Sequence, residues 1–404
     1  MPTKTNLFIL LTENNMPLYK YPITYNNNDV IENEKKIRSL SPKSSNAQNV
    51  IYKKHLKDFI KSFFYIILIF LLKKRNKTYL AFIPDGGLGD ILRQKAVIDA
   101  LTKMSPDIII DIYHKAAKPL VKDLRNIRFF LNKNSIYSTT KKYDIIIDNT
   151  VSLEYPQINI INRNNPLSKT MLNNIETYKK TYPFCFNDIS SFDMQKLAIK
   201  NNLHLINVSK IKSGVDKNYI SDISLNIEYR KVSLLKFGIY NDIKYITFQT
   251  GASNKGNIAH TKSWSTDNWK NLIVLLKDTL SSKNIKIVQV GVGQSKTDSD
   301  IDLVGKTNLD ELCCVLKKSL LHIDTDSGCM HIAKALKVKS LILFGPTNTQ
   351  YSLYSENINI ASTLCGGCYV INNWYEKCVL EYNPPLCMNS LTPRFVYQKV
   401  IENI

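Results

Sequence analysis

The sequence predicts an α/β protein made of two doubly wound domains that face each other across a cleft. The chain has 404 residues, which is too long for one compact domain, and 44% of them are hydrophobic, which is enough to build two cores. Short, nearly continuous apolar runs alternate with longer stretches of helical spacing, in two series that meet near residue 240. Such runs are typical of buried parallel strands, and their alternation with helices is typical of βαβ units.

The first series predicts strands at residues 79–83, 108–113 and 143–148, with helices between them. Residues 150–240 are expected to be less regular. The second series predicts strands at 245–249, 285–290, 319–324 and 340–344, and helices at 269–280, 309–317 and 330–336. We expect four parts: an accessory extension over 1–76, an N-terminal domain over 77–240, a C-terminal domain over 241–350, and a cysteine-rich segment with a C-terminal helix over 351–404.

The extension contains an apolar run of eleven residues, 62–72, with lysines before it and Lys73, Lys74 and Arg75 directly after it. A helix that spans a membrane needs about 20 apolar residues, so this run is short for that role. Three interpretations are open: a helix in the membrane interface with its lysines at the lipid phosphates, a helix buried in the core, and a tilted membrane span. Residues 1–50 are rich in Asn, Lys and Ser, so we expect them to be loosely ordered.

The net charge is +20, which predicts attraction to anionic partners such as phosphorylated glycolipid or an acidic membrane surface. A nucleic-acid partner is not expected, because the chain has no identifiable recognition module. Eight cysteines are too few and too unevenly spaced for a disulfide scaffold, and no cleavable signal peptide opens the chain. We therefore expect a cytoplasmic protein, with peripheral binding to the inner membrane as an option.

The first predicted strand runs into the sequence DGGLGD at residues 85–90. Gly86, Gly87 and Gly89 permit a tight turn from strand to helix and let a ligand approach the backbone. Asp90 then lies at the start of the helix. Two roles are open for it: an N-terminal cap, or a carboxylate that acts on a ligand in the cleft.

The second series begins with a strand that leads into Thr250, Gly251 and Ser253. Their backbone N–H groups and hydroxyls suit a phosphate, and Lys262 adds a point charge that suits a diphosphate. We therefore expect these four residues to bind the phosphates of a ligand.

The segment HIDTDSGCMHIAKAL, residues 322–336, is the most specific in the chain. It predicts a buried strand, a turn at Asp326, Ser327 and Gly328, and a helix with His331 in its first part. The small residues let a ligand approach the backbone, and the helix N-terminus and Ser327 offer donors to phosphate. His331 is expected either to face the ligand or to be a satisfied core histidine.

These segments resemble the family 9 glycosyltransferases, whose best-known members are ADP-heptose:lipopolysaccharide heptosyltransferases. The resemblance runs from residue 79 to the C-terminus and rests on DSGCMHIA at 326–333, LVGKTNLDEL at 303–312, LFGPT at 343–347, and the arrangement of Lys262, Trp264 and Trp269. It implies a GT-B fold of two Rossmann-like domains, with the nucleotide sugar held mainly by the C-terminal domain and the acceptor by the N-terminal one. GGLGD resembles the opening motif of the family and carries its proposed catalytic aspartate onto Asp90.

The resemblance further implies an inverting glycosyltransferase that moves a sugar, with ADP-heptose favoured as donor, onto a bacterial surface glycan such as lipopolysaccharide core. Asp90 would take the proton of the attacking hydroxyl, and the donor-side residues would stabilise the departing diphosphate, so no catalytic metal is expected. The alternatives are a non-catalytic nucleotide-sugar-binding or scaffold protein, and the same fold with another nucleotide sugar or a protein acceptor.

Four late cysteines, Cys365, Cys368, Cys378 and Cys387, have the spacing C-x2-C-x9-C-x8-C. Four thiolates with one tight knuckle are typical of a structural zinc site, and iron also accepts four thiolates. Four free thiols or a regulatory disulfide are the alternative, because a second knuckle is missing.

Overall fold

The computed structural model describes residues 76–84, 86–133, 142–149, 155–220, 223–226, 232–251, 253–254, 257–258, 260–292, 296–369 and 377–404. Residues 1–75, which include the predicted apolar run at 62–72, lie outside these ranges. Within them, no helix is both long enough and apolar enough to cross a membrane. The chain divides into two compact units between Ile223 and Ser224, and each is described separately below.

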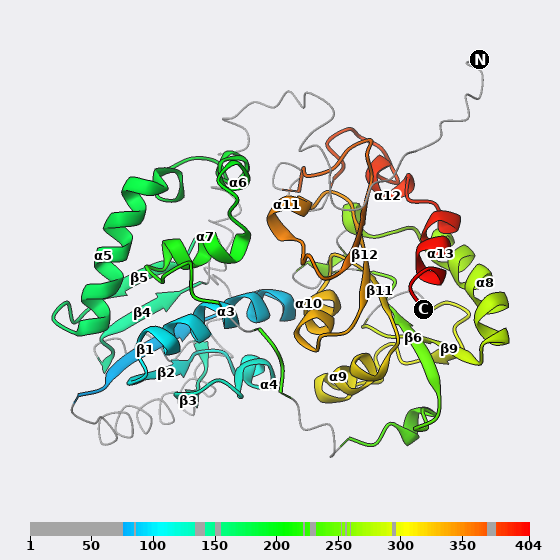
Figure 1. Cartoon of the computed structure of the whole chain (residues 1–404), viewed down its shortest axis with the longest axis horizontal. Coiled ribbons are helices and arrows are strands. Elements are labelled where there is room, and N and C mark those ends of the chain that lie inside the picture. The colour runs from blue at the N-terminus through cyan, green and yellow to red at the C-terminus, as the bar shows by residue number, and fades with distance from the viewer. Residues whose placement is uncertain are drawn as a thin grey trace, which may run out of the picture. The chain divides into compact units, whose positions relative to one another are not determined.

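The unit of residues 76–223 is built on a five-stranded sheet with the strand order β3-β2-β1-β4-β5 (Figure 1). The first four strands run parallel, and β5 pairs antiparallel with β4. The strands are β1 (Thr78–Ile83), β2 (Ile108–Ile112), β3 (Ile127–Phe130), β4 (Ile145–Asp148) and β5 (Gln157–Ile160). The sequence predicted β1, β2 and β4 but not β3 and β5, whose residues are only partly buried and so form no continuous apolar run.

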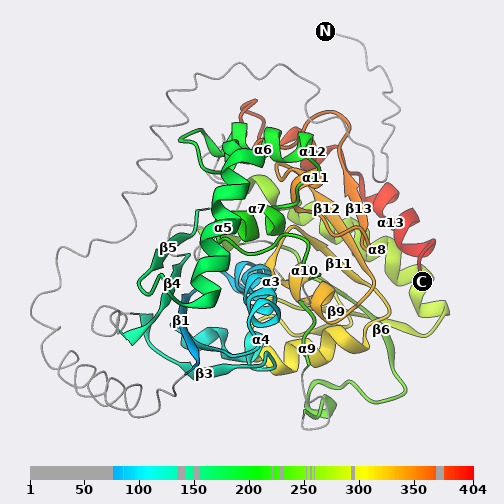
Figure 2. The ribbon, with the colours of Figure 1, turned by 60° about the vertical axis from the view of Figure 1, so that its left-hand side comes forward.

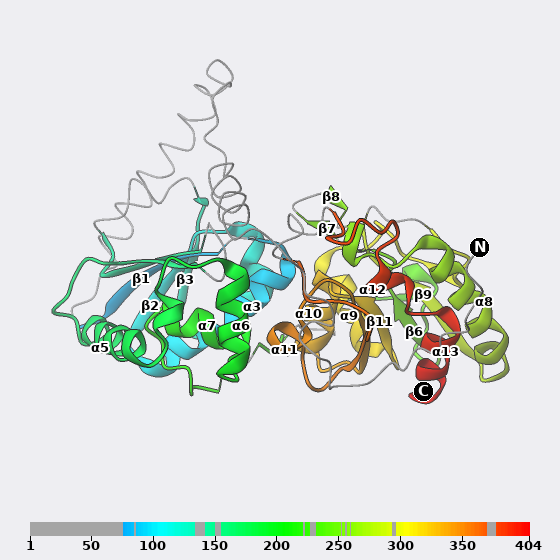
Figure 3. The same cartoon turned by 90° about the horizontal axis from the view of Figure 1, so that it is seen from above.

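The described helices of this unit lie on one face of its sheet (Figure 3). They are α3 (Leu88–Met104), α4 (Lys118–Val121), α5 (Pro166–Thr181), α6 (Ser191–Lys200) and α7 (Leu205–Lys212). Thr78 bonds to Asn165 at the start of α5, so the side of β1 that carries Thr78 faces the helices. The alternate residues of β1 point to the other face, where Tyr79, Ala81 and Ile83 belong to a buried cluster.

Helices α5, α6 and α7 correct the expectation that residues 150–240 are less regular. Few apolar residues mark α5, which buries Leu167 and Met171 but is otherwise rich in Asn and Lys. Its beginning is nevertheless well defined, because the side chain of Asn165 accepts from the N–H groups of Leu167 and Ser168, and Pro166 occupies the first turn. The local capping signal was present in the sequence, but the apolar periodicity was too weak to predict the helix.

The unit of residues 224–404 is built on a six-stranded parallel sheet with the order β10-β9-β6-β11-β12-β13. The strands are β6 (Lys244–Phe248), β9 (Ile285–Gln289), β10 (Ile301–Asp302), β11 (His322–Thr325), β12 (Ser340–Phe344) and β13 (Ile358–Ala361), and a short pair, β7 (Ser253–Asn254) and β8 (Asn257–Ile258), stands apart. The predicted α/β class is therefore confirmed. The strand predicted at 319–324 begins later, at His322, because Ser319 still caps the preceding helix.

The helices of this unit are α8 (Thr266–Ser282), α9 (Leu309–Lys318), α10 (Gly328–Ala335), α11 (Thr349–Ser352), α12 (Leu386–Asn389) and α13 (Pro393–Ile401). Helices α8 and α13 lie side by side in Figure 2. Thr279 on α8 and Tyr397 on α13 share a hydrogen bond of 2.7 Å. Trp264 and Trp269 are buried edge to face with ring centroids 5.1 Å apart, and Trp264 Nε1 donates to the carbonyl of Leu391 at 2.9 Å. The C-terminal helix is thus part of the core of this unit.

The buried ammonium of Lys210 on α7 should make the stability of the protein depend on pH. Its ammonium is buried and donates to the carbonyl of Tyr219 at 2.7 Å, and the burial lowers its pKa to about 8. The unfolded chain holds this proton up to pH ~10.4, so the free energy of unfolding should rise between pH 8 and 10 on account of Lys210.

We therefore compare the free energy of unfolding of Lys210→Met with that of wild type. The difference, variant minus wild type, should be larger at pH 7.5 than at pH 10, by an amount on the order of 1 kcal/mol. Urea unfolding of both proteins at the two pH values measures this difference. The contributions of other titrating groups cancel, because wild type and variant share those groups. A difference that is independent of pH would contradict the prediction.

Candidate functional site

Each sheet has a point at which its strand order reverses. In the six-stranded sheet the chain goes from β6 outward to β9 and β10 on one side, and then returns to β11 on the other side of β6. In the five-stranded sheet the corresponding point lies between β1 and β4. Open α/β sheets bind ligands at the carboxyl ends of the strands that flank such a point. The segments that follow β1, β6 and β11 are the ones that the sequence singled out.

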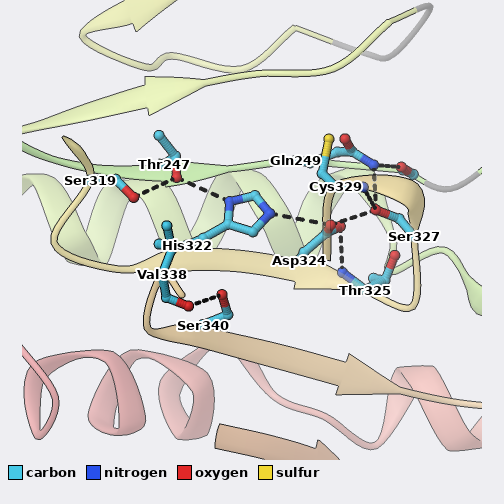
Figure 4. A network of polar contacts seen from close by, with 11 residues as sticks. Thr247, Gln249, Ser319, His322, Asp324, Thr325, Ser327, Cys329, Val338 and Ser340 are labelled. Carbon is cyan, nitrogen blue, oxygen red and sulfur yellow. Dashed lines mark hydrogen bonds and ion pairs between the residues drawn. The ribbon is translucent and has the colours of Figure 1, made fainter. Parts of the chain in front are cut away.

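The turn after β11, Asp326 to Gly328, is called the elbow here, and a buried carboxylate holds it (Figure 4). Ser327 Oγ donates to Asp324 Oδ2 at 2.5 Å, and the N–H of Thr325 donates to Asp324 Oδ1 at 2.7 Å. Asp324 is fully buried, and this burial raises the pKa of its carboxyl. Because both oxygens accept from the residues that follow, the carboxylate fixes the conformation of the elbow.

Gln249, directly after β6, ties the neighbouring strand to the elbow. Its Nε2 donates to Ser327 Oγ at 2.9 Å and to the carbonyl of Gly251 at 2.6 Å, and the N–H of Cys329 also donates to Ser327 Oγ, at 3.1 Å. The hydroxyl of Ser327 therefore accepts two hydrogen bonds and gives its proton to Asp324. In this arrangement it has no proton left for a phosphate. The donors that the elbow can offer are backbone N–H groups in the first turn of α10, for which Ser327 is the N-cap.

A chain of hydrogen bonds leads from Asp324 back along β11. Ser319 Oγ donates to the carbonyl of Leu316 at 2.9 Å and accepts from Thr247 Oγ1 at 3.2 Å. Thr247 has then given its only proton, so Nδ1 of His322, 3.0 Å away, is the donor between the two. Nε2 of His322 lies 3.3 Å from Asp324 Oδ2.

These contacts exclude two kinds of chemistry at Asp324. Ser327, His322 and Asp324 are not a nucleophilic triad, because Ser327 bonds to the carboxylate and not to the imidazole. Asp324 and Asp326 have the D-x-D spacing of some metal sites, but both oxygens of Asp324 are already engaged by the protein. Over the described ranges, no three or more His, Cys, Asp or Glu side chains are placed to hold a metal ion.

Asp326 in the elbow forms an ion pair with Lys262. Thr347 Oγ1 donates to Asp326 Oδ2 at 2.7 Å, and Nζ of Lys262 lies 3.9 Å from the same oxygen. The Lys262 side chain is 12% exposed and that of Asp326 is 7% exposed, so this pair is poorly screened by water. Lys262 comes from a short 3-10 turn, His260–Lys262, far from the elbow in sequence. The structure thus brings Lys262 close to Asp326 in the elbow, which also contains Ser327 and Gly328.

Thr250 and Gly251 also reach this end of the sheet, since Gln249 bonds to Gly251 as well as to the elbow. Thr250 Oγ1 accepts from Gln289 Nε2 at 3.4 Å. For Ser253 the structure describes only the backbone, in β7, so its predicted hydroxyl contact lies outside the description.

His331 is buried in the first half of α10. Its Nδ1 lies 2.8 Å from the hydroxyl of Tyr354, and the two rings pack edge to face at 5.5 Å. This contact fixes the ring of His331, which fits a satisfied core histidine; the alternative role toward a ligand stays a prediction.

The loop after β1 holds Asp90 from two sides. Gly86 has φ +95°, and a Cβ built on it would lie 2.4 Å from Asp90 Oδ2, so only glycine leaves room for the carboxylate. The N–H of Gly87 donates to Asp90 Oδ2 at 3.1 Å. Asp90 Oδ1 lies 3.9 Å from Arg93, and the Asp90 side chain is 46% exposed. Gly89 is buried in the first turn of α3. Asp90 is therefore the third residue of α3 and caps its start, while one oxygen faces outward.

Neighbouring cysteines shift the pKa values of three late cysteines, Cys365, Cys368 and Cys387. Cys365 accepts a hydrogen bond from the thiol of Cys387, which lowers the pKa of Cys365 and raises that of Cys387. Burial raises the pKa of Cys368 to about 12, and the neighbouring Cys365 and Cys378 add to this. The sulfurs thus share one neighbourhood, although they are not arranged as a ligand set.

Sequence reasoning missed the side chains that organise both turns. Gln249, Asp324 and Thr347 hold the elbow, and Gln94 and Asn149 play a related part beside Asp90. Gln249 and Asp324 end predicted strands, and Asn149 directly follows one. Thr347 lies three residues after a predicted strand, and Gln94 is a polar residue on a buried helix face. A polar residue at the carboxyl end of a buried strand was the available signal.

Comparison with known proteins finds similarity over part of this chain. Residues 183–376 match the model of glycosyltransferase family 9 (heptosyltransferase). This match covers just under half of the chain. It includes the elbow, Lys262, Gln249 and the first two of the four late cysteines.

Two curated relatives share part of the family 9 sequence. Lipooligosaccharide heptosyltransferase 2 of Haemophilus influenzae is 40% identical over 97 residues, which are 22% of this chain and 28% of the relative. Lipooligosaccharide heptosyltransferase 2 of Campylobacter jejuni is 34% identical over 107 residues, 26% of this chain and 30% of the relative. The chain thus aligns with less than a third of the length of either relative.

Solved structures share the fold over a larger part of the chain. ADP-heptose lps heptosyltransferase II of E. coli has a TM-score of 0.50 at 13% identity, covering 80% of this chain and 98% of its own. A second similar structure is the dodecameric iron-containing heptosyltransferase TibC of enterotoxigenic E. coli, in complex with ADP-D-beta-D-heptose. Its TM-score is 0.55 at 14% identity, and the match covers 82% of this chain and 77% of TibC. The chain has the GT-B fold of these heptosyltransferase structures.

The loop around Asp90 gives a direct test of its geometry. Gly86→Ala adds a Cβ at a positive φ and against the carboxylate, so we expect it to displace Asp90 and to cost about 1–2 kcal/mol of stability in the first turn of α3. Hydrogen–deuterium exchange of the peptide that contains residues 88–95 measures this opening.

Gly87→Ala is the matched control, because a Cβ on Gly87 meets nothing within 4 Å and φ there is −79°. We expect Gly87→Ala to exchange nearly as slowly as wild type. Equal exchange in both variants would show that the contact between Gly86 and Asp90 does not hold the turn.

Proposed function

We propose that this protein is an inverting glycosyltransferase that moves a sugar from a nucleotide sugar, most readily ADP-heptose, onto a bacterial surface glycan such as the core of lipopolysaccharide. The observation that carries the proposal is the family 9 match over the segment that builds the elbow at the reversal point of the second sheet. The names of the partial relatives support heptose as the sugar.

The unit of residues 224–404 would hold the donor. Lys262 supplies a positive charge, and the N-terminus of α10 supplies backbone N–H groups and the positive end of its dipole. Thr250, Gly251 and the backbone near Ser253 would line the same end of the sheet. As the bond to the sugar breaks, negative charge grows on the diphosphate, and these donors stabilise it without a catalytic metal.

The unit of residues 76–223 would supply the base. The carboxylate of Asp90 would take the proton of the acceptor hydroxyl while that oxygen attacks the anomeric carbon and the diphosphate leaves from the opposite face. The N–H of Gly87 engages Oδ2, and the other oxygen, Oδ1, which lies 3.9 Å from the Arg93 guanidinium, would take the proton. Capping and catalysis are therefore compatible at Asp90.

Substitutions in the two units should separate the two roles. Asp90→Asn can still accept the Gly87 N–H but cannot take a proton, so turnover should fall roughly 10²- to 10⁴-fold with donor affinity unchanged. Lys262→Ala should weaken donor binding about tenfold or more, because it removes a charge-assisted contact to phosphate.

Asp99→Asn on the same helix as Asp90, and Lys277→Ala in the same unit as Lys262, are matched controls, since both residues form ordinary ion pairs with neighbours. Both controls should behave as wild type. Undiminished turnover in Asp90→Asn would remove Asp90 from the mechanism and favour the non-catalytic alternative, a nucleotide-sugar-binding or scaffold protein.

We also propose a structural zinc or iron ion at Cys365, Cys368, Cys378 and Cys387. Four thiols of suitable type share one neighbourhood, and TibC is described as iron-containing. The sulfurs would have to converge further to coordinate an ion, since the described arrangement is not a ligand set. The ion would order the segment and take no part in the transfer.

Metal analysis of protein purified without chelator should find about one zinc or iron per chain, and the Cys365→Ser variant should lose most of it. Lys377→Ala, next to the cluster, is a control that should keep the metal. Protein without either metal, whose thiols react freely in the native state, would contradict this proposal and favour four free thiols.

The net charge and the run at residues 62–72 suggest that the enzyme works at an anionic membrane surface, on the cytoplasmic side. Removing residues 1–76 should reduce flotation with anionic liposomes while ADP binding stays nearly intact. Equal flotation of full-length and shortened protein would favour the alternative of a buried helix.

A further inference from the structure

Two buried amides connect the Asp90 turn to the next strand of the sheet. Gln94 Nε2 donates to the backbone carbonyl of Asp90 at 3.1 Å, and Asn149 Nδ2 donates to Gln94 Oε1 at 3.1 Å. Both side chains are 1% exposed. Asn149 follows β4, and its own N–H donates to the carbonyl of Ile83 at the end of β1 at 2.9 Å. The pair therefore joins the start of α3 to the reversal point between β1 and β4.

The orientation of both amides follows from their partners. A backbone carbonyl only accepts, so the NH₂ of Gln94 must face Asp90, and its oxygen is then left to face Asn149. The NH₂ of Asn149 must point to that oxygen, which leaves Asn149 Oδ1 at the far end of the pair. This oxygen is buried and has no hydrogen-bond partner among the described residues.

Such a pair is not explained by stability alone. A buried amide with an unsatisfied oxygen costs free energy, and an apolar side chain of the same size would avoid this cost. Polar groups that are retained against their local cost are concentrated at functional sites. Here the hydrogen bonds act on the one residue of this unit to which we assign chemistry.

We propose that Gln94 and Asn149 are positioning residues, which hold the first turn of α3 against the sheet and so fix where the Asp90 carboxylate lies. This rests on the proposed role of Asp90 as the base. The loop at Gly86 and Gly87 restrains the carboxylate of Asp90, and the two amides restrain the backbone of Asp90. A base displaced by about 1 Å can lose roughly 100-fold in rate, so this restraint acts on turnover and not on donor binding.

The test uses Gln94→Met and Asn149→Ala in the full chain, two variants that break the same connection at different places. We expect each to lower kcat about 10- to 100-fold with the KM for donor unchanged, and to speed hydrogen exchange at residues 88–95. Asn165→Ala is the matched control, because Asn165 makes similar bonds at the opposite end of β1. It should change neither kcat nor exchange at 88–95.

Adding either change to Asp90→Asn separates this inference from the proposed function. If the amides act through Asp90, the double variants should be no slower than Asp90→Asn alone. Wild-type kcat in both single variants, or losses that multiply with Asp90→Asn, would overturn the positioning role. Wild-type turnover in Asp90→Asn would show that Asp90 is not the base. In that case hydrogen exchange at residues 88–95 still tests the restraint, and wild-type exchange in both amide variants would overturn it.

Discussion

The carboxylate of Asp324 is the interaction on which the donor side of this protein depends. It is fully buried at the end of β11, where an unpaired charge would be costly, and it is compensated by Ser327, the N–H of Thr325 and His322. Because Ser327 also accepts from Gln249, the same carboxylate indirectly fixes the end of β6. These contacts restrain the conformation of the elbow without any ligand, and such restraint is what the proposed phosphate site requires.

The first unit holds its turn by a comparable device made of neutral groups. Amides from α3 and from the end of β4 act on the Asp90 backbone, while Gly86 and Gly87 shape the loop in front of it. In both units, polar side chains at the reversal point of the sheet fix a turn that the strand alone would leave mobile. The two devices differ in their groups: a buried carboxylate organises the elbow, whereas two neutral amides hold the Asp90 turn.

The sequence predicted most of what depends on neighbouring residues in the chain. Continuous apolar runs gave β1, β6 and β12 nearly to the residue, and small residues between a strand and a helix gave the elbow. The short or half-exposed strands β3, β5, β10 and β13 were missed because they carry little apolar periodicity. The polar contacts were missed because their partners are distant in sequence: 78 residues separate Gln249 from Ser327, and 55 separate Asn149 from Gln94. Ser327 shows a further limit, since its hydroxyl was expected to meet phosphate and instead bonds within the protein.

The central claim is that the second unit is a preformed site for a nucleoside diphosphate, and thermal unfolding in the presence of ADP, UDP, GDP and inorganic phosphate tests it most directly. A ligand at 100 times its Kd stabilises the folded state by about 2.7 kcal/mol, which is a clear rise in Tm. The account predicts that ADP raises the Tm of the wild-type protein, that UDP and GDP raise it less, and that the rise with ADP is reduced in Lys262→Ala. No shift with any nucleotide, or an equal shift with inorganic phosphate alone, would contradict it.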